Sequence, residues 1–176
     1  MLMRLFRRSA KEESAAALYQ AAVLQARRPE FYLEAAVPDT LDGRFDLLAL
    51  HVFLLLHRLR VAGPRAAALA QTVFDLMFAD MDQNLRELGV GDLSVGRKVK
   101  TMAQALMGRI AAYEPGLADP SVLAEALARN LYRGRPVPDE AVARVVRYVG
   151  AAVGDLARQN VDALLAGQVR FVAPFA

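Results

Sequence analysis

Acidic side chains are concentrated just before the middle of the chain, where their spacing at first suggests cation binding. The string D-x-D-x-N from Asp80 begins like the calcium loop of an EF-hand. The pattern then fails, because Leu85 stands where glycine is needed and Gly91 where a bidentate glutamate is needed. On a helix, Asp80 and Asp82 also point to different faces. The sequence therefore predicts no metal site here, but an i, i+4 ion pair between Asp82 and Arg86.

The sequence contains no arrangement of residues suited to catalysis or to cofactor binding. The chain has two histidines and no cysteine. His51 and His57 are six residues apart on an expected helix and face roughly opposite ways, so they cannot form a metal site by themselves. There is no nucleophile elbow and no H-E-x-x-H motif, and no cysteine for thiol, iron–sulfur or zinc chemistry. We therefore predict a protein that is not an enzyme and has no cofactor.

A turn with two glycines, Gly89-Val90-Gly91-Asp92, separates two expected helices. It follows a helix and lacks the spacing of phosphate-binding loops, so we interpret it as a connection in which glycine supplies a positive φ. Arg97, Lys98 and Lys100 come near the start of the next helix, as in the recognition helix of a helix–turn–helix. They alternate with valine and follow an acidic helix, so we expect no DNA binding. A nucleic-acid-binding helix–turn–helix protein stays as a less favoured alternative.

Helices are the elements that must position these residues, because capping and breaking signals recur along the chain. We predict six main helices, over about residues 9–27, 40–60, 64–88, 94–113, 119–134 and 138–167, with a short helical turn within residues 31–37. Ser9 with Glu12 forms a capping box, and Thr40 and Ser94 are expected N-caps. Pro115-Gly116 is expected to end the fourth of these helices.

The helix over residues 40–60 is expected at the centre of the fold. Apolar side chains occupy nearly its whole circumference: Phe45, Leu47, Leu48, Leu50, Val52, Leu54, Leu55 and Leu59. A helix that is apolar all round has to be buried among other helices. The predicted fold is therefore all-α, a single-domain bundle of about six main helices around an apolar central helix.

Charged residues crowd the start of this central helix: Asp39, Asp42, Arg44 and Asp46. Asp42 suits the positive end of the helix dipole, and Arg44 can pair with a neighbouring acid. Charges beside an apolar helix can also form the orienting rim of a binding groove. Both interpretations, surface pairing and recognition, stay open at this point.

The two ends of the chain differ from its body. The chain has 176 residues, 55% of them hydrophobic, and a net charge of +3. We divide it into a basic and apolar arm (1–8), a helical domain (9–167) and an apolar tail (168–176). The arm, M-L-M-R-L-F-R-R, is too short for a secretory signal but could lie on a membrane surface. We expect a cytoplasmic protein, with a peripheral place on the cytoplasmic face of the inner membrane left open.

Two long motifs stand out from plain helix periodicity. They are V-P-D-T-L-D-G-R-F-D-L-L-A-L-H from Val37 to His51 and F-A-D-M-D-Q-N-L-R-E-L-G-V-G-D-L-S-V-G-R-K-V-K from Phe78 to Lys100. Shorter matches accompany them at Phe31-Tyr32, Gly108-Arg109 and Ala112-Tyr113. Over roughly residues 21–148 the chain resembles the ubiquinol–cytochrome c chaperone family of mitochondria and α-proteobacteria, in its bacterial form.

The resemblance implies a non-enzymatic assembly chaperone for ubiquinol–cytochrome c reductase, respiratory complex III. Its expected partner is newly made cytochrome b or an early complex III intermediate. Mitochondrial members of the family also act with a small partner protein and can associate with ribosomes. A lipid- or quinone-binding helical carrier is the alternative from a different class.

A client with long apolar helices needs an apolar groove with charges at its rim. Methionine suits adaptable grooves and plain cores alike, and four lie on the helices beside the glycine turn: Met77, Met81, Met102 and Met107. The predicted partner-binding residues are Asp39, Asp42, Gly43, Arg44, Asp46, His51, Asp80, Asp82, Arg86, Gly89, Gly91, Asp92, Lys98, Lys100, Arg109 and Tyr113.

Overall fold

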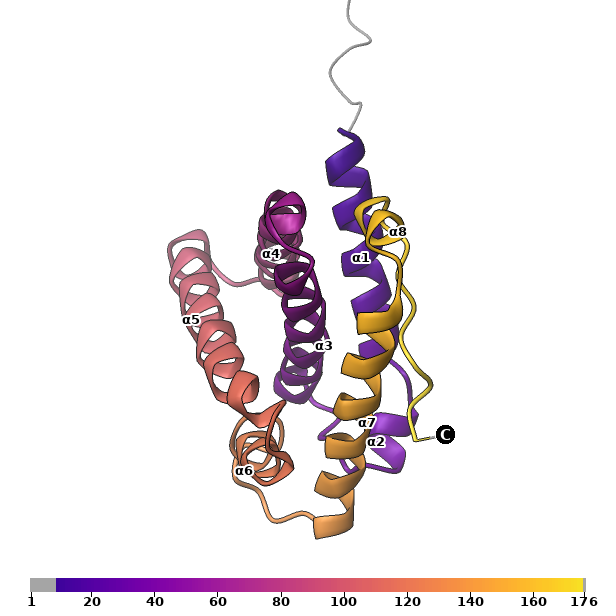
Figure 1. The fold of residues 1–176 in the computed structure, drawn as a ribbon. Helices are drawn as coiled ribbons and strands as arrows, with labels where there is room; N and C mark the ends of the chain where they lie inside the picture. The colour runs from indigo at the N-terminus through magenta and orange to yellow at the C-terminus, as the bar shows by residue number, and fades with distance from the viewer. Residues whose placement is uncertain (1–8, 176) are drawn as a thin grey trace, which may run out of the picture.

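A computed structural model describes residues 9–175 (Figure 1). This part of the chain forms eight helices: α1 (Ala10–Ala26), α2 (Glu30–Leu33), α3 (Leu41–Val61), α4 (Pro64–Glu87), α5 (Asp92–Gly116), α6 (Pro120–Asn130), α7 (Asp139–Arg158) and α8 (Val161–Leu165). It contains no strand. The predicted all-α fold is confirmed. No helix in the described range is both long and apolar enough to cross a bilayer.

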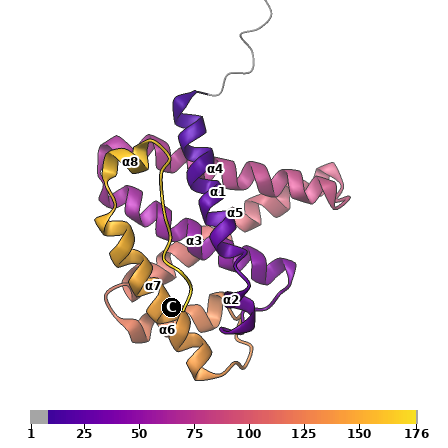
Figure 2. The same cartoon turned by 90° about the vertical axis from the view of Figure 1, so that its right-hand side faces the viewer.

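α3 is the buried centre of the bundle, as the sequence predicts. Leu47, Leu50 and Leu54 are completely buried, and α1, α4, α5 and α7 all pack against this helix (Figures 1 and 2). Each buried leucine stabilises the fold by about 1.5–3 kcal/mol relative to an exposed one. The apolar surface of α3 therefore explains why helices surround it.

Local signals set several helix ends where the sequence predicts them. Ser9 and Glu12 form the reciprocal capping box of α1. The Thr40 side chain accepts a hydrogen bond from the Gly43 N–H at 3.1 Å at the start of α3. Gly89 follows the end of α4 with a φ of 78°, a conformation that favours glycine. These contacts satisfy backbone groups that a helix end would otherwise leave unpaired.

The boundaries of α5 differ from the prediction. α5 begins at Asp92 with Gly91 as its N-cap, so Ser94 lies in the first turn and is not the cap. The helix also continues through Pro115 to Gly116. The proline is tolerated there because it comes in the last turn, where only one hydrogen bond of the helix is lost.

The predicted helices over residues 119–134 and 138–167 are both too long. α6 ends at Asn130, and Arg133 and Gly134 adopt positive φ angles in the turn that follows. The last helix breaks after Arg158, because Gln159 is extended and the Asn160 side chain caps a separate helix, α8. An asparagine N-cap is a local signal that the apolar periodicity of this region obscures.

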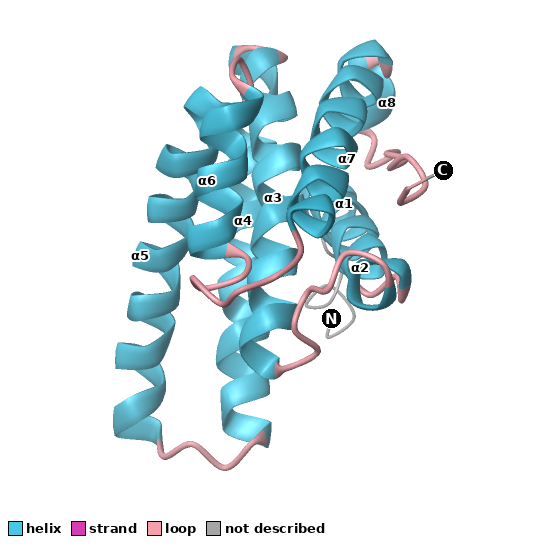
Figure 3. Ribbon diagram, turned by 90° about the horizontal axis from the view of Figure 1, so that it is seen from below, coloured by secondary structure: helices cyan, strands magenta, loops and turns pink. Residues whose placement is uncertain are grey.

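α4 and α5 form an antiparallel hairpin that projects beyond the other helices (Figures 2 and 3). Its base packs on α3, and its tip is the turn at residues 88–91. At the other end of the chain, residues 168–175 fold back onto the body, where the Phe175 ring lies 5.3 Å from that of Phe31. The apolar tail therefore completes the core instead of extending away from it.

Gly43 allows the chain entering α3 to pack closely, and this generates the first prediction. A Cβ atom at residue 43 would lie 2.0 Å from the Pro38 carbonyl oxygen, which is backbone and cannot rotate away. We expect Gly43→Ala to lower the free energy of unfolding by about 1–3 kcal/mol in urea titrations. Gly96→Ala is the matched control, because a Cβ atom there meets nothing within 4 Å. It should gain about 0.5–1 kcal/mol from helix propensity, and equal losses in both variants would contradict the prediction.

Candidate partner-binding site

Asp46 is a completely buried carboxylate near the start of α3, and two arginines hold it. Arg109 of α5 donates to Oδ1, and Nε of Arg133, which follows α6, donates to Oδ2 at 2.5 Å. Arg133 also reaches Asp42 at 2.8 Å, and the Arg109 guanidinium lies 5.6 Å from the centroid of the Phe45 ring. An unpaired buried carboxylate would cost several kcal/mol. These contacts therefore fasten α5 and the α6–α7 connection to α3.

Tyr113 lies one turn beyond Arg109 on α5 and belongs to the same buried region. Its ring packs 5.5 Å from that of Phe53, and its hydroxyl has no hydrogen-bond partner among the described residues. Burial raises the pKa of the Tyr113 hydroxyl, so the group is neutral. Four predicted site residues, Asp42, Asp46, Arg109 and Tyr113, thus come together in one structural junction. Arg133 was not among the predicted site residues, because it is 87 residues from Asp46 and no local sequence pattern marks it.

Asp39 and Arg44 form a separate pair on the surface at the entry to α3. Arg44 Nε donates to Asp39 Oδ1 at 2.6 Å, and both side chains are more than half exposed. The hydrogen bond from Arg44 holds the pKa of the Asp39 carboxyl below its usual value. The predicted pairing of Arg44 with a neighbouring acid is confirmed. An exposed pair of this kind contributes little to stability, so it is free to exchange partners.

His51 lies in the core of the bundle, in a continuous hydrogen-bond chain. Nδ1 donates to the Leu47 carbonyl and Nε2 accepts from the Tyr148 hydroxyl, each at 2.8 Å. Gln25 of α1 donates to the same hydroxyl at 3.1 Å and to the Val172 carbonyl at 2.8 Å. The chain of contacts therefore links α1, α3, α7 and the C-terminal tail. Burial lowers the pKa of His51 to about 4, so the ring is neutral at pH 7.

The second predicted charge cluster lies on the outer half of the α4–α5 hairpin. Asp80 accepts from the Tyr19 hydroxyl of α1 at 2.7 Å, whereas Asp82 pairs with Arg86 at 2.5 Å. Arg86 also contacts Asp92 across the glycine turn. The predicted Asp82–Arg86 pair is confirmed, and Asp80 points to another side of α4, toward Tyr19 of α1. Within residues 9–175, no group of three or more His, Asp or Glu side chains is placed to hold a metal ion.

The basic residues after the turn do not have helix–turn–helix geometry. Lys98 and Lys100 are exposed on α5 and form no ion pair within the described part of the chain. α4 and α5 run side by side in opposite directions (Figure 3), whereas the helices of a DNA-binding helix–turn–helix cross steeply. The turn containing Gly89 and Gly91 therefore closes a hairpin and does not present a recognition helix.

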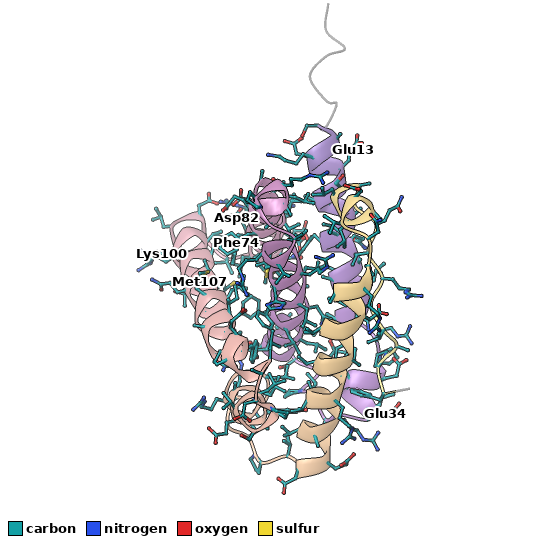
Figure 4. All side chains as sticks on the ribbon, in the orientation of Figure 1. Glu13, Glu34, Phe74, Asp82, Lys100 and Met107 are labelled. Atoms are coloured by element: carbon teal, nitrogen blue, oxygen red, sulfur yellow. The ribbon has the colours of Figure 1, made fainter. Side chains whose placement is uncertain are left out.

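An apolar groove lies at the base of this hairpin, where α4 leaves the end of α3 and meets α5. Its volume is about 720 Å³, and it is lined by Leu56, Arg60, Gly63, Pro64, Ala67, Ala70, Gln71, Phe74, Met107 and Ile110. Phe74 and Met107 come from the two facing helices, and Met107 is 53% exposed (Figure 4). Among the methionines considered above, Met77 is completely buried, and Met81 and Met102 are half-buried. The predicted partner-binding residues do not line this groove.

The sequence model of the family described as ubiquinol-cytochrome C chaperone matches residues 33–171. The chain belongs to this family. The matched region runs from α2 into the C-terminal tail, further toward the C-terminus than the resemblance at residues 21–148 predicted. It includes the Asp46 junction, His51 and the apolar groove.

Relatives and a solved structure agree with the family. Ubiquinol-cytochrome-c reductase complex assembly factor 1 of Xenopus laevis is 27% identical over 154 residues, covering 86% of this chain and 77% of its own. The mouse protein of that name is 28% identical, and the match covers 88% of this chain and 53% of the mouse protein. Mitochondrial protein CBP3 of Saccharomyces cerevisiae is 30% identical, and the match covers 82% of this chain and 44% of CBP3. The chain thus spans about half the length of these last two relatives. The crystal structure of the Cbp3 homolog from Brucella abortus matches with a TM-score of 0.83. Its sequence is 37% identical, and the match covers 98% of this chain and 97% of the Brucella chain.

The buried Asp46 junction of this family member gives a second prediction. We expect Asp46→Asn to lower the free energy of unfolding by about 3–5 kcal/mol, because it leaves the buried guanidinium of Arg109 without a carboxylate and leaves Arg133 with Asp42 alone. Asp42→Asn is the control, since that side chain is 71% exposed and pairs only at the surface. Urea unfolding followed by circular dichroism measures both. Similar small changes in the free energy of unfolding of Asp46→Asn and Asp42→Asn would show that the junction does not hold the helices together.

The buried His51 gives a third prediction, on pH. The folded-state pKa is about 4, below the ordinary value of 6.5, so the unfolded chain binds a proton that the folded chain excludes. Stability should be full above pH 6.5 and fall by up to about 3 kcal/mol as the pH is lowered toward 4. His51→Gln should flatten this slope in urea titrations, whereas His57→Gln should retain it. A slope unchanged by His51→Gln would refute the assignment.

Proposed function

We propose that this chain is a non-enzymatic assembly factor for ubiquinol–cytochrome c reductase, complex III, that holds newly made cytochrome b or an early intermediate. The observation that carries the proposal is the apolar groove at the base of the α4–α5 hairpin, within the region that the family model matches. The Xenopus laevis and mouse relatives are named as assembly factors of that reductase. Binding, without a catalytic step, is the activity that we assign to the groove.

The groove has the chemistry that an apolar client helix needs. Small residues on α4, Ala67 and Ala70, allow another helix to approach closely. Phe74 and Met107 supply contact area, and the thioether of methionine adapts to irregular surfaces. Recognition of a helix in such a groove uses apolar side chains on one face of the client. Unassembled cytochrome b would present faces of this kind.

The charged residues have two proposed roles. Asp46, Arg109 and His51 are buried, so they act by holding α3, α5 and α7 in the arrangement that forms the groove. The exposed pairs, Asp39–Arg44 and Asp82–Arg86, are available to orient a client. We also propose that the protein works peripherally at the cytoplasmic face of the inner membrane. A small partner protein and ribosome contact, which the resemblance implies for mitochondrial members, would use other surfaces.

The groove gives a fourth prediction, tested in cells that depend on this protein. Ala67→Glu places a charged side chain in the groove and should reduce assembled complex III severalfold, because the client then buries a charge. Ala68→Glu is the matched control, since Ala68 is also exposed on α4 but does not line the groove. Native gels stained for complex III and spectra of cytochrome b provide the measurement.

Purified Ala67→Glu protein should keep its helix content and its unfolding midpoint, because residue 67 is exposed. Equal complex III in cells with Ala67→Glu and Ala68→Glu would exclude the groove as the client site. Normal complex III after deletion of the whole gene would exclude the assembly function itself.

A further inference from the structure

The tip of the α4–α5 hairpin exposes two large apolar side chains that the fold does not use. Leu88, at the end of α4, is 62% exposed, and Leu93, at the start of α5, is 92% exposed. The hairpin carries both beyond the rest of the described chain (Figures 2 and 3). Single exposed leucines are common on protein surfaces, and what distinguishes these two is their place on either side of the turn that ends a projecting hairpin.

Basic side chains lie directly behind these leucines on α5. Arg97 and Lys100 follow Leu93 at intervals of four and seven residues, so they share its face of the helix. Arg97, Lys98 and Lys100 are all exposed and form no ion pair within residues 9–175. Of the two acids near the tip, Asp92 contacts Arg86, and Glu87 accepts from Gln83 at 2.7 Å. Together with Asp82, which pairs with Arg86, residues 82–100 have four basic and three acidic side chains, and the cations without an ion pair among the described residues, Arg97, Lys98 and Lys100, all lie on the α5 side of the tip.

We propose that this tip docks on a bilayer surface that contains anionic phospholipid, with Leu88 and Leu93 inserted between the headgroups. The dimensions fit this arrangement. With a helical rise of 1.5 Å per residue, Arg97 lies about 6 Å and Lys100 about 10 Å behind Leu93 along α5. Interfacial elements bury their apolar side chains about 5–10 Å deep, so the cations would stand at the level of the phosphates.

Lipid fits this surface better than RNA, the other polyanion that a basic tip could contact. RNA would use the cations but would leave the two leucines in water, whereas a bilayer satisfies both kinds of side chain. The inference deepens the proposed peripheral place at the membrane, on which it rests, by naming the surface that contacts lipid, and it requires no client. The groove lies on the same two helices, so a docked tip would hold it close to the membrane.

The absence of tryptophan from the sequence allows a direct test. Leu93→Trp in the full-length protein provides a single fluorophore at the tip, and Leu33→Trp is the control, because Leu33 is 81% exposed on α2. With vesicles of phosphatidylcholine and phosphatidylglycerol, Leu93→Trp emission should shift to shorter wavelength and be quenched by brominated lipid. Leu33→Trp emission should not change. No shift for Leu93→Trp, or a shift with RNA alone, would overturn the proposal.

A charge variant tests the second half of the surface. Replacing Arg97, Lys98 and Lys100 by glutamine should weaken partition onto the anionic vesicles, by about fivefold for each cation. The control replaces three exposed arginines away from the tip, Arg27, Arg129 and Arg135, by glutamine. Equal partition of the two triple variants in vesicle sedimentation would contradict a tip-first contact. Both measurements use purified protein, so their failure would leave the groove and its client untouched.

Discussion

The rest of the structure depends on the enclosure of α3, whose apolar surface extends almost all round the helix. Other helices must cover it, and the polar side chains that it carries must find partners inside the core. Asp46 pairs with Arg109 of α5 and with Arg133 of the α6–α7 connection. His51 accepts a hydrogen bond from Tyr148 of α7. Apolar packing tolerates sliding of one helix past another, whereas these polar contacts are satisfied in one arrangement only. They therefore fix how α5 and α7 sit on α3.

This arrangement also explains where the surface stays open. α4 packs on α3 and α1 and still contacts α1 at Asp80, while α5 is fixed to α3 near its C-terminal end through Arg109 and Tyr113. The two helices are consequently held together at the base of the hairpin, where an apolar groove remains, and project freely toward the tip (Figure 3). The same contacts that stabilise the core thus leave both an apolar groove and an exposed end.

Several features that depend on neighbouring residues could be predicted from the sequence, although the N-cap of α5 and the break at Asn160 were not, whereas contacts between distant side chains could not be predicted. The capping box at Ser9, the Thr40 cap and the Asp82–Arg86 pair are all local, and all are confirmed. Arg133 had no signal, because its partner is 87 residues away. The predicted site was based on charge density, but two of its charged residues, Asp46 and Arg109, are buried and pair with each other inside the fold. The groove instead uses alanine, phenylalanine and methionine, residues that any helix core contains.

We propose that cytochrome b binds in the groove between α4 and α5. The most direct measurement is photocrosslinking in cells from an amino acid incorporated at residue 107, in the groove, with residue 33 on α2 as the control. Both positions are exposed, so either can be modified without disturbing the core. Our account predicts that cytochrome b is captured from residue 107 and not from residue 33. Capture from residue 33 alone, or no capture of cytochrome b from residue 107, would contradict it.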